Sequence, residues 1–415
     1  MSTKEKKALV PNQRFPEFQT AGEWVLCKLK DACKVNPANS GLPGQFVYID
    51  LESVEAGKLT ARKIINRDEA PSRAQRVLSS EDVIFQIVRP YQRNNFHFKP
   101  SDHLSYVAST GYAQLRAKNS SDFLFQAIHV DGFVERVIAK CTGSSYPAIN
   151  SSDLAEISLA VPEPKEQQKI ADCLSSLDEL IAAQGRKVEA LKIHKKGVMQ
   201  QLFPREGETQ PRLRFPEFEA SADWEETRLG KLGKLVSGLT YSPDDVRESG
   251  LLVLRSSNVQ NGEIALGDCV YVDPSIKGAN LSQPEDILIC VRNGSKALIG
   301  KCALIPQGMP LCTHGAFMTV FRADTPSFVF QLFQSDRYQK QVAGDLGATI
   351  NSINGSQFLK YEFMVPKPAE QKRIADFLVS LDALITAADQ ELDTLKTHKK
   401  GLMQQLFPIS EAMES

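Results

Sequence analysis

The sequence lacks the features that would place it at once among membrane, secreted or strongly charged proteins. Its 415 residues contain no apolar run of about 18 residues, so no membrane-spanning helix is predicted. The opening MSTKEKKALVPNQ has lysines but no apolar stretch, so we expect no signal peptide. Lys and Arg number 49 against 50 Asp and Glu. This balance neither indicates nor excludes a nucleic-acid partner, which requires only a local basic surface.

Cysteine occurs without any pairing pattern. The eight cysteines are scattered and form no C-x-x-C pair. The sequence therefore predicts neither a disulfide framework nor a zinc site, and it indicates a reducing cytoplasm. Cys312 and His314 come nearest to a pair of metal ligands, and we interpret them as an ordinary strand or loop segment. We expect no metal in this chain.

Complete catalytic motifs are also missing. There is no G-x-x-x-x-G-K-[ST] phosphate loop. An adenine-N6 methyltransferase needs an Asn/Asp-Pro-Pro-aromatic stretch, which neither NPANS (36–40) nor DPSIK (273–277) supplies. PDDVR (243–247) and PEDILIC (284–290) are poor versions of a nuclease carboxylate cluster. The sequence therefore predicts a protein that binds and does not catalyse.

What the sequence does contain is a duplication. HKKGVMQQLFP at 194–204 returns as HKKGLMQQLFP at 398–408. RFPEF occurs at 14–18 and 214–218, and the only two tryptophans, Trp24 and Trp224, follow at matching positions. Residues 14–204 and 214–408 are thus two copies of one unit, which is too few for a solenoid.

Similarity between the copies is uneven. VPEPKEQQKIA (161–171) and VPKPAEQKRIA (365–375) open a closely similar segment of about 40 residues, the length of a long helix. The middle portions, about 45–140 and 245–345, align poorly. We infer that the ends share one task while the middles perform two different ones. We expect the tryptophans to pack in a core or at a domain junction.

The similar segments carry a heptad pattern. Apolar side chains recur at alternating steps of four and three residues, which is typical of a helix that packs along a narrow seam. The predicted interface residues are Ile170, Leu174, Leu177, Ile181, Val188, Leu191, Ile374, Leu378, Leu381, Ile385, Leu392 and Leu395. Gln184, Lys195 and Lys399 interrupt the seam and are expected to set its register. The alternative is that each helix lies as an amphipathic helix on its own domain.

Two features near the end of each helix need an interpretation. Gly197 and Gly401 each cost about 1 kcal/mol in a helix, so they predict a close backbone approach or an early helix end. His194 and His398 invite a catalytic role because they repeat. We interpret them instead as surface residues near a helix C-terminus, where lysines are also favoured.

The remainder of each copy mixes strands and helices. VIFQIV (83–88), LLVLRSSNV (251–259), DILICV (286–291) and FMTVFRA (317–323) are expected to be strands. SSDFLFQAIH (120–129) and PSFVFQLFQSDRYQKQV (326–342) are expected to be helices.

The predicted fold class is α+β, with two tandem α/β domains and two long helices paired as a coiled coil. An antiparallel pair would relate the domains by a pseudo-two-fold axis, and a parallel pair would place both domains at one end. The seam does not choose between these arrangements. The predicted division is 1–163 and 205–367 for the domains, 164–204 for the first helix, and 368–415 for the second helix and tail. An antiparallel arrangement would suit duplex DNA, whose backbone has the same symmetry.

These residues also carry a family resemblance. The chain resembles a specificity subunit of a type I restriction–modification system over essentially its whole length. The marks are W-x-x-x-x-L at Trp24 and Trp224, VPEPKEQQKIA with VPKPAEQKRIA, and the helices that end in LFP. EAPSRAQRVLSSEDVIFQIVRPYQRNN (69–95) is similar to one class of target recognition domain. LRSSNVQNGEI (254–264) and DILICVRNGSKALIGKCALI (286–305) resemble another.

The resemblance implies a function and partners. Each variable middle would read one half of a bipartite DNA site. The paired helices would form an antiparallel coiled coil with a pseudo-two-fold axis and would set the unread spacer. Two methyltransferase subunits, using S-adenosylmethionine, would methylate adenine at N6 in each half-site. Motor-nuclease subunits, using ATP and Mg²⁺, would join for restriction. The chain itself would hold no cofactor, contact no membrane and act in the cytoplasm.

Candidate DNA contacts come from residue chemistry. Phosphates attract Lys, Arg, Ser and Asn, while Arg suits guanine and Asn suits adenine. The candidates are Arg62, Lys63, Arg67, Arg73, Arg76, Arg89, Arg93, Asn94, Asn95, Lys99, Arg255, Ser256, Ser257, Asn258, Arg292, Asn293, Ser295, Lys296 and Lys301. Any of them is otherwise a solvated surface residue. RPYQRNN and VRNGSK, each at a strand end, are the favoured clusters.

Two other functions are compatible with the pattern. The pattern also fits a variant subunit of a fused or two-component restriction system with the same recognition logic. It would alternatively be a structural adaptor whose helices serve protein assembly alone, and an adaptor predicts DNA binding of non-specific strength at best.

Overall fold

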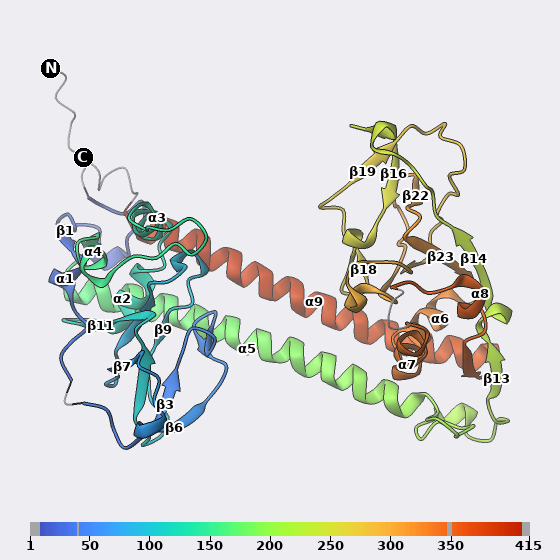
Figure 1. Ribbon diagram of the computed structural model, residues 1–415, viewed down its shortest axis with the longest axis horizontal. Coiled ribbons are helices and arrows are strands. Elements are labelled where there is room, and N and C mark those ends of the chain that lie inside the picture. The colour runs from blue at the N-terminus through green and yellow to red at the C-terminus, as the bar shows by residue number, and fades with distance from the viewer. Residues whose placement is uncertain (1–8, 40, 347–350, 409–415) are drawn as a thin grey trace. The chain divides into compact units, whose positions relative to one another are not determined.

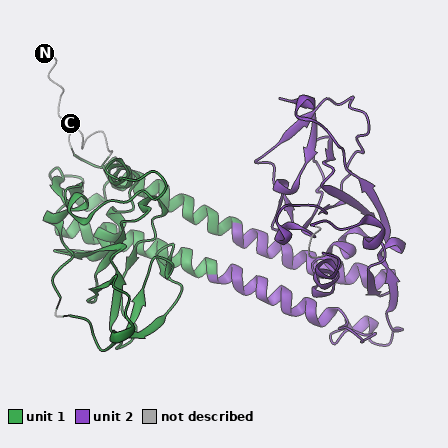
Figure 2. Ribbon diagram, in the orientation of Figure 1, with its two compact units in different colours: residues 1–185, 390–415 green, residues 186–389 purple. Residues whose placement is uncertain are grey.

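The chain folds into two compact units. The computed structural model describes residues 9–39, 41–346 and 351–408 (Figure 1). Unit 1 comprises residues 1–185 and 390–415, and unit 2 comprises residues 186–389 (Figure 2). Both divisions fall inside long helices, α5 (Pro164–Leu202) and α9 (Pro368–Leu406). Each unit is therefore built from both repeats.

Unit 1 contains the strands of the first repeat and its short helices. Its strands are β1 (Val25–Lys28), β2 (Cys33–Val35), β3 (Gln45–Ile49), β4 (Val54–Glu55), β5 (Lys58–Leu59), β6 (Lys63–Asn66), β7 (Ala74–Val77), β8 (Val83–Gln86), β9 (Phe96–His97), β10 (Tyr106–Ser109), β11 (Tyr112–Ala117) and β12 (Ser158–Val161). Its short helices are α1 (Leu29–Ala32), α2 (Ser121–Ala127), α3 (Asp131–Ala139) and α4 (Ser151–Ala155).

Unit 2 contains the corresponding elements of the second repeat. Its strands are β13 (Glu225–Arg228), β14 (Gly233–Ser237), β15 (Val246–Arg247), β16 (Leu251–Leu254), β17 (Val259–Gln260), β18 (Glu263–Ile264), β19 (Val270–Val272), β20 (Ile287–Cys290), β21 (Cys302–Leu304), β22 (Cys312–His314), β23 (Met318–Ala323) and β24 (Glu362–Val365). Its short helices are α6 (Pro326–Phe333), α7 (Asp336–Asp345) and α8 (Gly355–Phe358).

The two units share a topology although their middle sequences differ. In unit 1 the sheet order β2-β11-β8-β9 matches β14-β23-β20-β21 in unit 2, and every pairing is antiparallel. A second four-stranded sheet in each unit includes one parallel pair, β3 with β10 and β16 with β22. A two-stranded sheet, β1-β12 or β13-β24, leads into the long helix. The mixed helix and sheet content confirms the α+β prediction.

The long helices pair antiparallel within each unit. In unit 1, Asp178 of α5 lies opposite Lys399 of α9, and Gln184 donates to Glu391 at 2.8 Å. In unit 2, Lys192 of α5 lies opposite Asp389 and Lys195 lies opposite Asp382, so the residue numbers of the two helices run in opposite directions. The direction that the heptad pattern left open is thereby observed in both units.

The predicted seam positions all lie away from solvent to some degree. Ile170, Leu174, Val188, Ile374 and Leu378 are buried. The half-buried positions are Leu177, Ile181, Leu191, Leu381, Ile385, Leu392 and Leu395. The best-buried positions lie mostly where the helices also touch the sheets, and the part between is more open to solvent.

The seam lysines form reciprocal ion pairs. Lys399 Nζ lies 2.7 Å from both carboxylate oxygens of Asp178, and Lys195 Nζ lies 2.6 and 2.8 Å from those of Asp382. Each Lys comes from one repeat and each Asp from the other. Gln126 of α2 donates to Asp178 at 2.8 Å, and Gln331 of α6 donates to Asp382 at 3.1 Å. These three-residue clamps tie a globular part to both helices.

The repeated LFP segments complete the hydrophobic cores. In unit 1 the ring of Phe407 lies 5.8 Å from that of Trp24 and 5.7 Å from that of Phe123. In unit 2 the ring of Phe203 lies 6.1 Å from that of Trp224. The end of each long helix therefore packs against the globular part of the opposite repeat. Both tryptophans lie in a core, at 3% exposure, as the sequence predicted.

The repeated RFPEF motif anchors the start of each long helix. Arg14 forms a two-pronged ion pair with Glu166, at 2.8 and 2.5 Å, and Arg214 does the same with Glu370, at 2.8 Å twice. All four side chains are at least nine-tenths buried. A carboxylate in the first turn also meets the positive end of the helix dipole. Because the pair is buried, loss of one partner would leave an uncompensated charge.

Three local predictions need correction. The helix expected over 326–342 is broken into α6 and α7, because Ser335 caps α7 by accepting a hydrogen bond from Tyr338 N. The strand expected over 251–259 ends at Leu254 and is followed by a 3-10 turn, Ser256–Asn258. Both alternatives for Gly197 and Gly401 are wrong: the helices continue past them, and an added Cβ would meet nothing within 4 Å.

The helix bounds compare directly with the predicted segments. The sequence predicts helices within 164–204 and 368–415, and α5 and α9 begin at Pro164 and Pro368. Residues 409–415 lie outside the described part of the chain. The compact units group residues by contact and cut both helices, so the four-part division of the sequence stays a prediction.

The cross-repeat packing of Phe407 predicts a large effect on stability. We expect Phe407→Ala to lower the free energy of unfolding by about 3–5 kcal/mol, because it removes a buried ring from between two others. Phe317→Ala is the matched control, since that ring is 58% exposed. Chemical denaturation of both variants measures the difference, and equal midpoints would contradict the packing.

Candidate nucleic-acid interface

The two favoured clusters occupy equivalent places in the two units. RPYQRNN follows β8 and VRNGSK begins at the end of β20, and these strands hold the same position in matching sheets. The strands themselves are fully buried, so the chain emerges from the core directly into each cluster. The two units thus present different sequences at corresponding places, one after β8 and the other after β20.

Arg89 is held firmly at the first of these sites. Its backbone N–H donates to Pro147 O at 2.7 Å, and its φ of 54° is left-handed. The guanidinium carbon lies 4.5 Å from the ring centre of Tyr146, which is 64% exposed. A left-handed backbone costs a non-glycine residue on the order of 1–2 kcal/mol, and such strain is concentrated at functional sites.

Arg292 of unit 2 also lies near an exposed aromatic ring, one position earlier than Arg89, because Arg292 bridges Ser352 as Val88 bridges Ala148. Its N–H donates to Phe317 O at 3.1 Å, and its guanidinium carbon lies 5.8 Å from the Phe317 ring centre. That ring is 58% exposed. Within the described residues, neither Arg89 nor Arg292 forms an ion pair with a carboxylate.

An arginine that lies on an exposed ring and has no acidic partner is prepared for recognition. Stacking fixes the plane of the guanidinium while its edge keeps free N–H groups. Such an edge matches the O6 and N7 acceptors of guanine in the major groove. It also matches a phosphate, so the geometry supports a nucleic-acid contact and leaves the choice between base and backbone to experiment.

Other candidates are occupied by acidic partners. Arg62 pairs with Asp102, Arg93 with Asp131 at 2.7 Å, Lys99 with Asp122 at 2.7 Å, and Arg255 with Asp268 at 2.7 Å. These pairs are partly exposed, so they hold the side chains in place with little net stabilisation. The Arg93 hydrogen bond is the main reason that the pKa of Asp131 is lowered.

Two candidates are corrected by the structure because their side chains point inward. Asn95 is 1% exposed, and its amide oxygen accepts from Gln86 N at 2.9 Å while its Nδ2 lies 3.2 Å from His129 Nε2. Asn258 is 0% exposed and bonds to Arg255 N, Ala265 O and Asp268 O. Both amides hold loops together and are buried away from solvent.

The remaining candidates divide by their surroundings. Arg67 donates to the Leu42 and Pro43 carbonyls, Asn94 accepts from Ala56 N at 3.2 Å, and Asn293 donates to Ser256 Oγ at 3.2 Å, which joins the two candidate segments of unit 2. Arg76 is half-buried, and burial lowers its pKa. The exposed candidates are Lys63, Arg73, Ser257, Ser295, Lys296 and Lys301.

Reasoning from the sequence missed the rings of Tyr146 and Phe317. Each comes from a segment remote in sequence from the arginine that it supports, so spacing gave no signal. The Gln partners of the clamps were also missed, but they had a signal. FLFQ (123–126) and FVFQ (328–331) are a second repeated motif, inside middles that otherwise align poorly.

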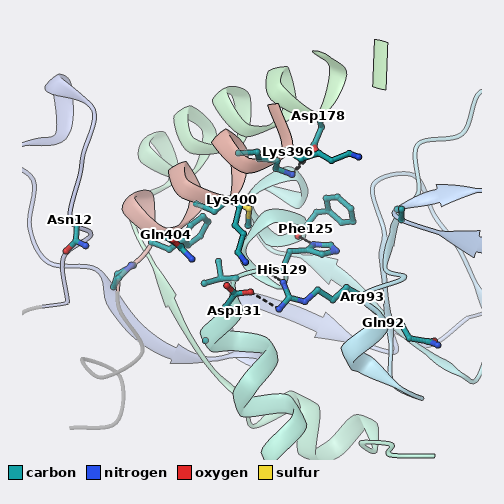
Figure 3. A pocket seen from close by; sticks show the side chains of 18 residues that line it. Asn12, Gln92, Arg93, Phe125, His129, Asp131, Asp178, Lys396, Lys400 and Gln404 are labelled. Atoms are coloured by element: carbon teal, nitrogen blue, oxygen red, sulfur yellow. Dashed lines mark hydrogen bonds and ion pairs between the residues drawn. The ribbon is translucent and has the colours of Figure 1, made fainter. Parts of the chain in front are cut away.

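Unit 1 also contains a large open cavity beside the end of α9. Its volume is about 900 Å³, and its lining includes Arg93, His129, Asp131, Lys399 and Lys400 (Figure 3). His129 Nδ1 donates to Phe125 O at 2.6 Å, so Nε2 is left as an acceptor. Burial lowers the pKa of His129 to about 4, so this ring is neutral near pH 7.

Metal ligation finds no support around Cys312 and His314. Both are buried in β22, and the His314 ring nitrogens lie 3.0 Å from Ser282 Oγ and 2.9 Å from Val236 O. No group of three potential ligands occurs among the residues that the structure describes. In the same part of the chain, no helix combines the length and hydropathy needed to cross a bilayer.

Known proteins similar to this chain belong to one group. The specificity subunit of restriction enzyme StySPI from Salmonella potsdam is 29% identical over 191 residues, which are 44% of this chain and 41% of that protein. The EcoKI specificity subunit of Escherichia coli strain K12 is 31% identical over 176 residues, 40% of this chain and 37% of that protein. The MjaVIII specificity subunit of Methanocaldococcus jannaschii is 26% identical and covers 72% of this chain and 73% of its own length. The alignments thus reach less than half of the first two relatives.

Solved structures agree on the fold. The S subunit of a type I restriction–modification system from M. genitalium superimposes with a TM-score of 0.57 at 15% identity, covering 97% of this chain and all of that one. A chain from a study of complex assembly and conformational transition of the type I R-M system gives 0.55 at 22% identity, over 93% and 98%. The family model of the type I restriction modification DNA specificity domain matches residues 22–192 and again residues 221–397. The chain therefore belongs to the type I restriction modification DNA specificity family and carries its domain twice.

Proposed function

We propose that this chain is the DNA-recognition subunit of a type I restriction–modification complex and that it binds a bipartite site on double-stranded DNA. Each globular part would read one short half-site, and the paired helices would set the length of the unread spacer. The observation that carries this proposal is the arginine on an exposed aromatic ring, Arg89 on Tyr146 and Arg292 on Phe317. It occurs just beyond the corresponding strand, β8 or β20, in two domains whose sequences otherwise differ.

The two domains share a sheet order but differ in the residues of their clusters, and this contrast supports two different half-sites. The sheets that present the two clusters have the same strand order, so both domains offer a similar platform. The residues on that platform differ, because RPYQRNN and VRNGSK share little beyond an Arg-Asn pair. One platform with two sets of side chains is suited to two different short sequences.

The partners follow from the family and the duplication. Two methyltransferase subunits, which hold S-adenosylmethionine, would dock on the parts that both repeats share, the long helices and their flanking motifs. They would methylate adenine at N6 in each half-site. Motor-nuclease subunits with ATP and Mg²⁺ would complete an ATP-dependent restriction complex in the cytoplasm. This chain would recognise DNA and leave catalysis to those subunits.

The direct test is to map methylated adenines. The chain is produced together with its methyltransferase subunit in a host that lacks both, and N6-methyladenine is located by single-molecule sequencing. We expect one bipartite motif with a fixed spacer, and none when this chain is omitted. Methylation that is scattered, or that continues without the chain, would refute the proposal.

Exchange of one domain should change half of the motif. Residues 45–140, which include the clamp residue Gln126, are replaced by the corresponding segment of another specificity subunit that has Gln at the matching position, while Asp178 stays in place. We expect one half-site to change while the other half-site and the spacer stay. A change in both halves would show that the domains do not read independently.

Removal of one stacked arginine should relax one position of the motif. If Arg89 or Arg292 contacts guanine with two hydrogen bonds, its replacement by Ala weakens discrimination at one base pair by about 1–3 kcal/mol. Arg205→Ala, which removes an exposed charge that is not among the candidate contacts, is the control. Methylation rates on a panel of single-base variants measure the effect, and an equal loss on every sequence would identify a phosphate contact instead.

A further inference from the structure

The cavity of unit 1 brings together cationic groups from two sources. Arg93 reaches it from the turn after β8, while Lys396, Lys399 and Lys400 reach it from the last part of α9. Figure 3 shows Lys400 and Gln404 extending from α9 towards the segment that carries His129 and Asp131. The cavity therefore lies where the globular part of the first repeat meets the helix of the second.

The charges that line this cavity do not cancel. Four cations, Arg93 and the three lysines, face two carboxylates, Asp131 and Asp178, an excess of two positive charges. Arg93 is paired with Asp131 at 2.7 Å and Lys399 with Asp178 at 2.7 Å. Lys396 pairs at 3.1 Å with Asp393, a carboxylate outside the lining. No ion pair to Lys400 occurs within the described residues, so its ammonium is the group with most freedom to bind an anion.

The surroundings of Lys400 favour a compact anion over an apolar ligand. Lys400 interacts with the carboxylate of Asp131, which is already paired with Arg93, and His129 in the same lining is neutral near pH 7 and adds no charge. Amide groups of Asn12, Gln92 and Gln404 add hydrogen-bond donors along the wall. Lysine ammonium groups together with neutral donors are the usual ligands of a phosphate oxygen.

We propose that this cavity is a phosphate-binding site in which Lys400 and Lys396 are the principal ligands. The inference rests on the proposed function: the phosphate belongs to the backbone of the bound duplex, at a place that carries no sequence information. The second lysine of HKKG repeats in both copies, whereas two different half-sites would need different residues. A free phosphorylated molecule offers the same chemistry and is the other source to be tested.

The experiment measures how binding depends on salt. The full chain is titrated with a fluorescent duplex of mixed sequence between about 50 and 200 mM salt, where each phosphate contact contributes about 0.9 to the slope of log K against log salt. We expect Lys400→Ala to lower this slope by about 0.9 and Lys400→Arg to restore it. The matched control is Lys165→Ala, because Lys165 is an exposed lysine of α5 that does not line this cavity.

The outcomes distinguish a site for backbone phosphate, a site for a free phosphorylated molecule and the absence of a phosphate site. A lower slope for Lys400→Ala alone supports a site for the DNA backbone. An unchanged slope, combined with thermal stabilisation of the wild-type chain by pyrophosphate that Lys400→Ala abolishes, supports a site for a free phosphorylated molecule. Equal effects of Lys400→Ala and Lys165→Ala, or no effect in either assay, overturn the proposal.

This test is independent of the proposed function. If the site binds backbone, Lys400→Ala leaves the methylated motif unchanged while it weakens binding uniformly. If the wild-type chain directs no motif at all, the proposed function fails, yet the salt slope still reports whether the cavity binds phosphate. Melting curves of each variant confirm that the fold is retained.

Discussion

The architecture depends on one constraint: the end of each long helix completes the core of the unit that holds the opposite repeat. Phe407 fills the space beside Trp24, and Phe203 does the same beside Trp224. The Lys399–Asp178 and Lys195–Asp382 pairs fix the register a few turns away. Neither repeat contains a complete core by itself, because part of each core comes from the other repeat. This explains why HKKG[VL]MQQLFP is written twice almost without change.

Because of the same constraint, the middle of each repeat can vary in sequence without loss of the assembly. Gln126 and Gln331 connect the variable parts to the clamps, and RFPEF secures the helix starts through buried ion pairs. Everything that positions a domain is thus carried by short repeated motifs. The loops after β8 and β20 belong neither to the clamps nor to the RFPEF ion pairs, so their residues can differ while the sheet that presents them stays the same. A recognition protein that must change its target without changing its assembly needs this separation.

Periodic and repeated features of the molecule could be predicted from the sequence, whereas the surroundings of single residues could not. The heptad seam indicated the long helices because its spacing is a property of the chain alone. The direction of their pairing required the observed partners, such as Lys195 and Asp382. Asn95 and Asn94 look alike in a loop sequence, yet one is buried and the other is not, because burial depends on segments remote in the chain. The ring that supports Arg89 could not be foreseen for the same reason.

The central claim is that the paired helices set the distance between the two half-sites. Its most direct test inserts one heptad into α5 and one into α9, opposite each other near Gln184 and Glu391, so that the register of both clamps is kept. Seven residues lengthen a helix by about 10 Å. That length corresponds to about three base pairs at a rise of about 3.4 Å. The account predicts a methylated motif with the same two half-sites and a spacer longer by about three base pairs. Methylation at the original spacer would contradict it.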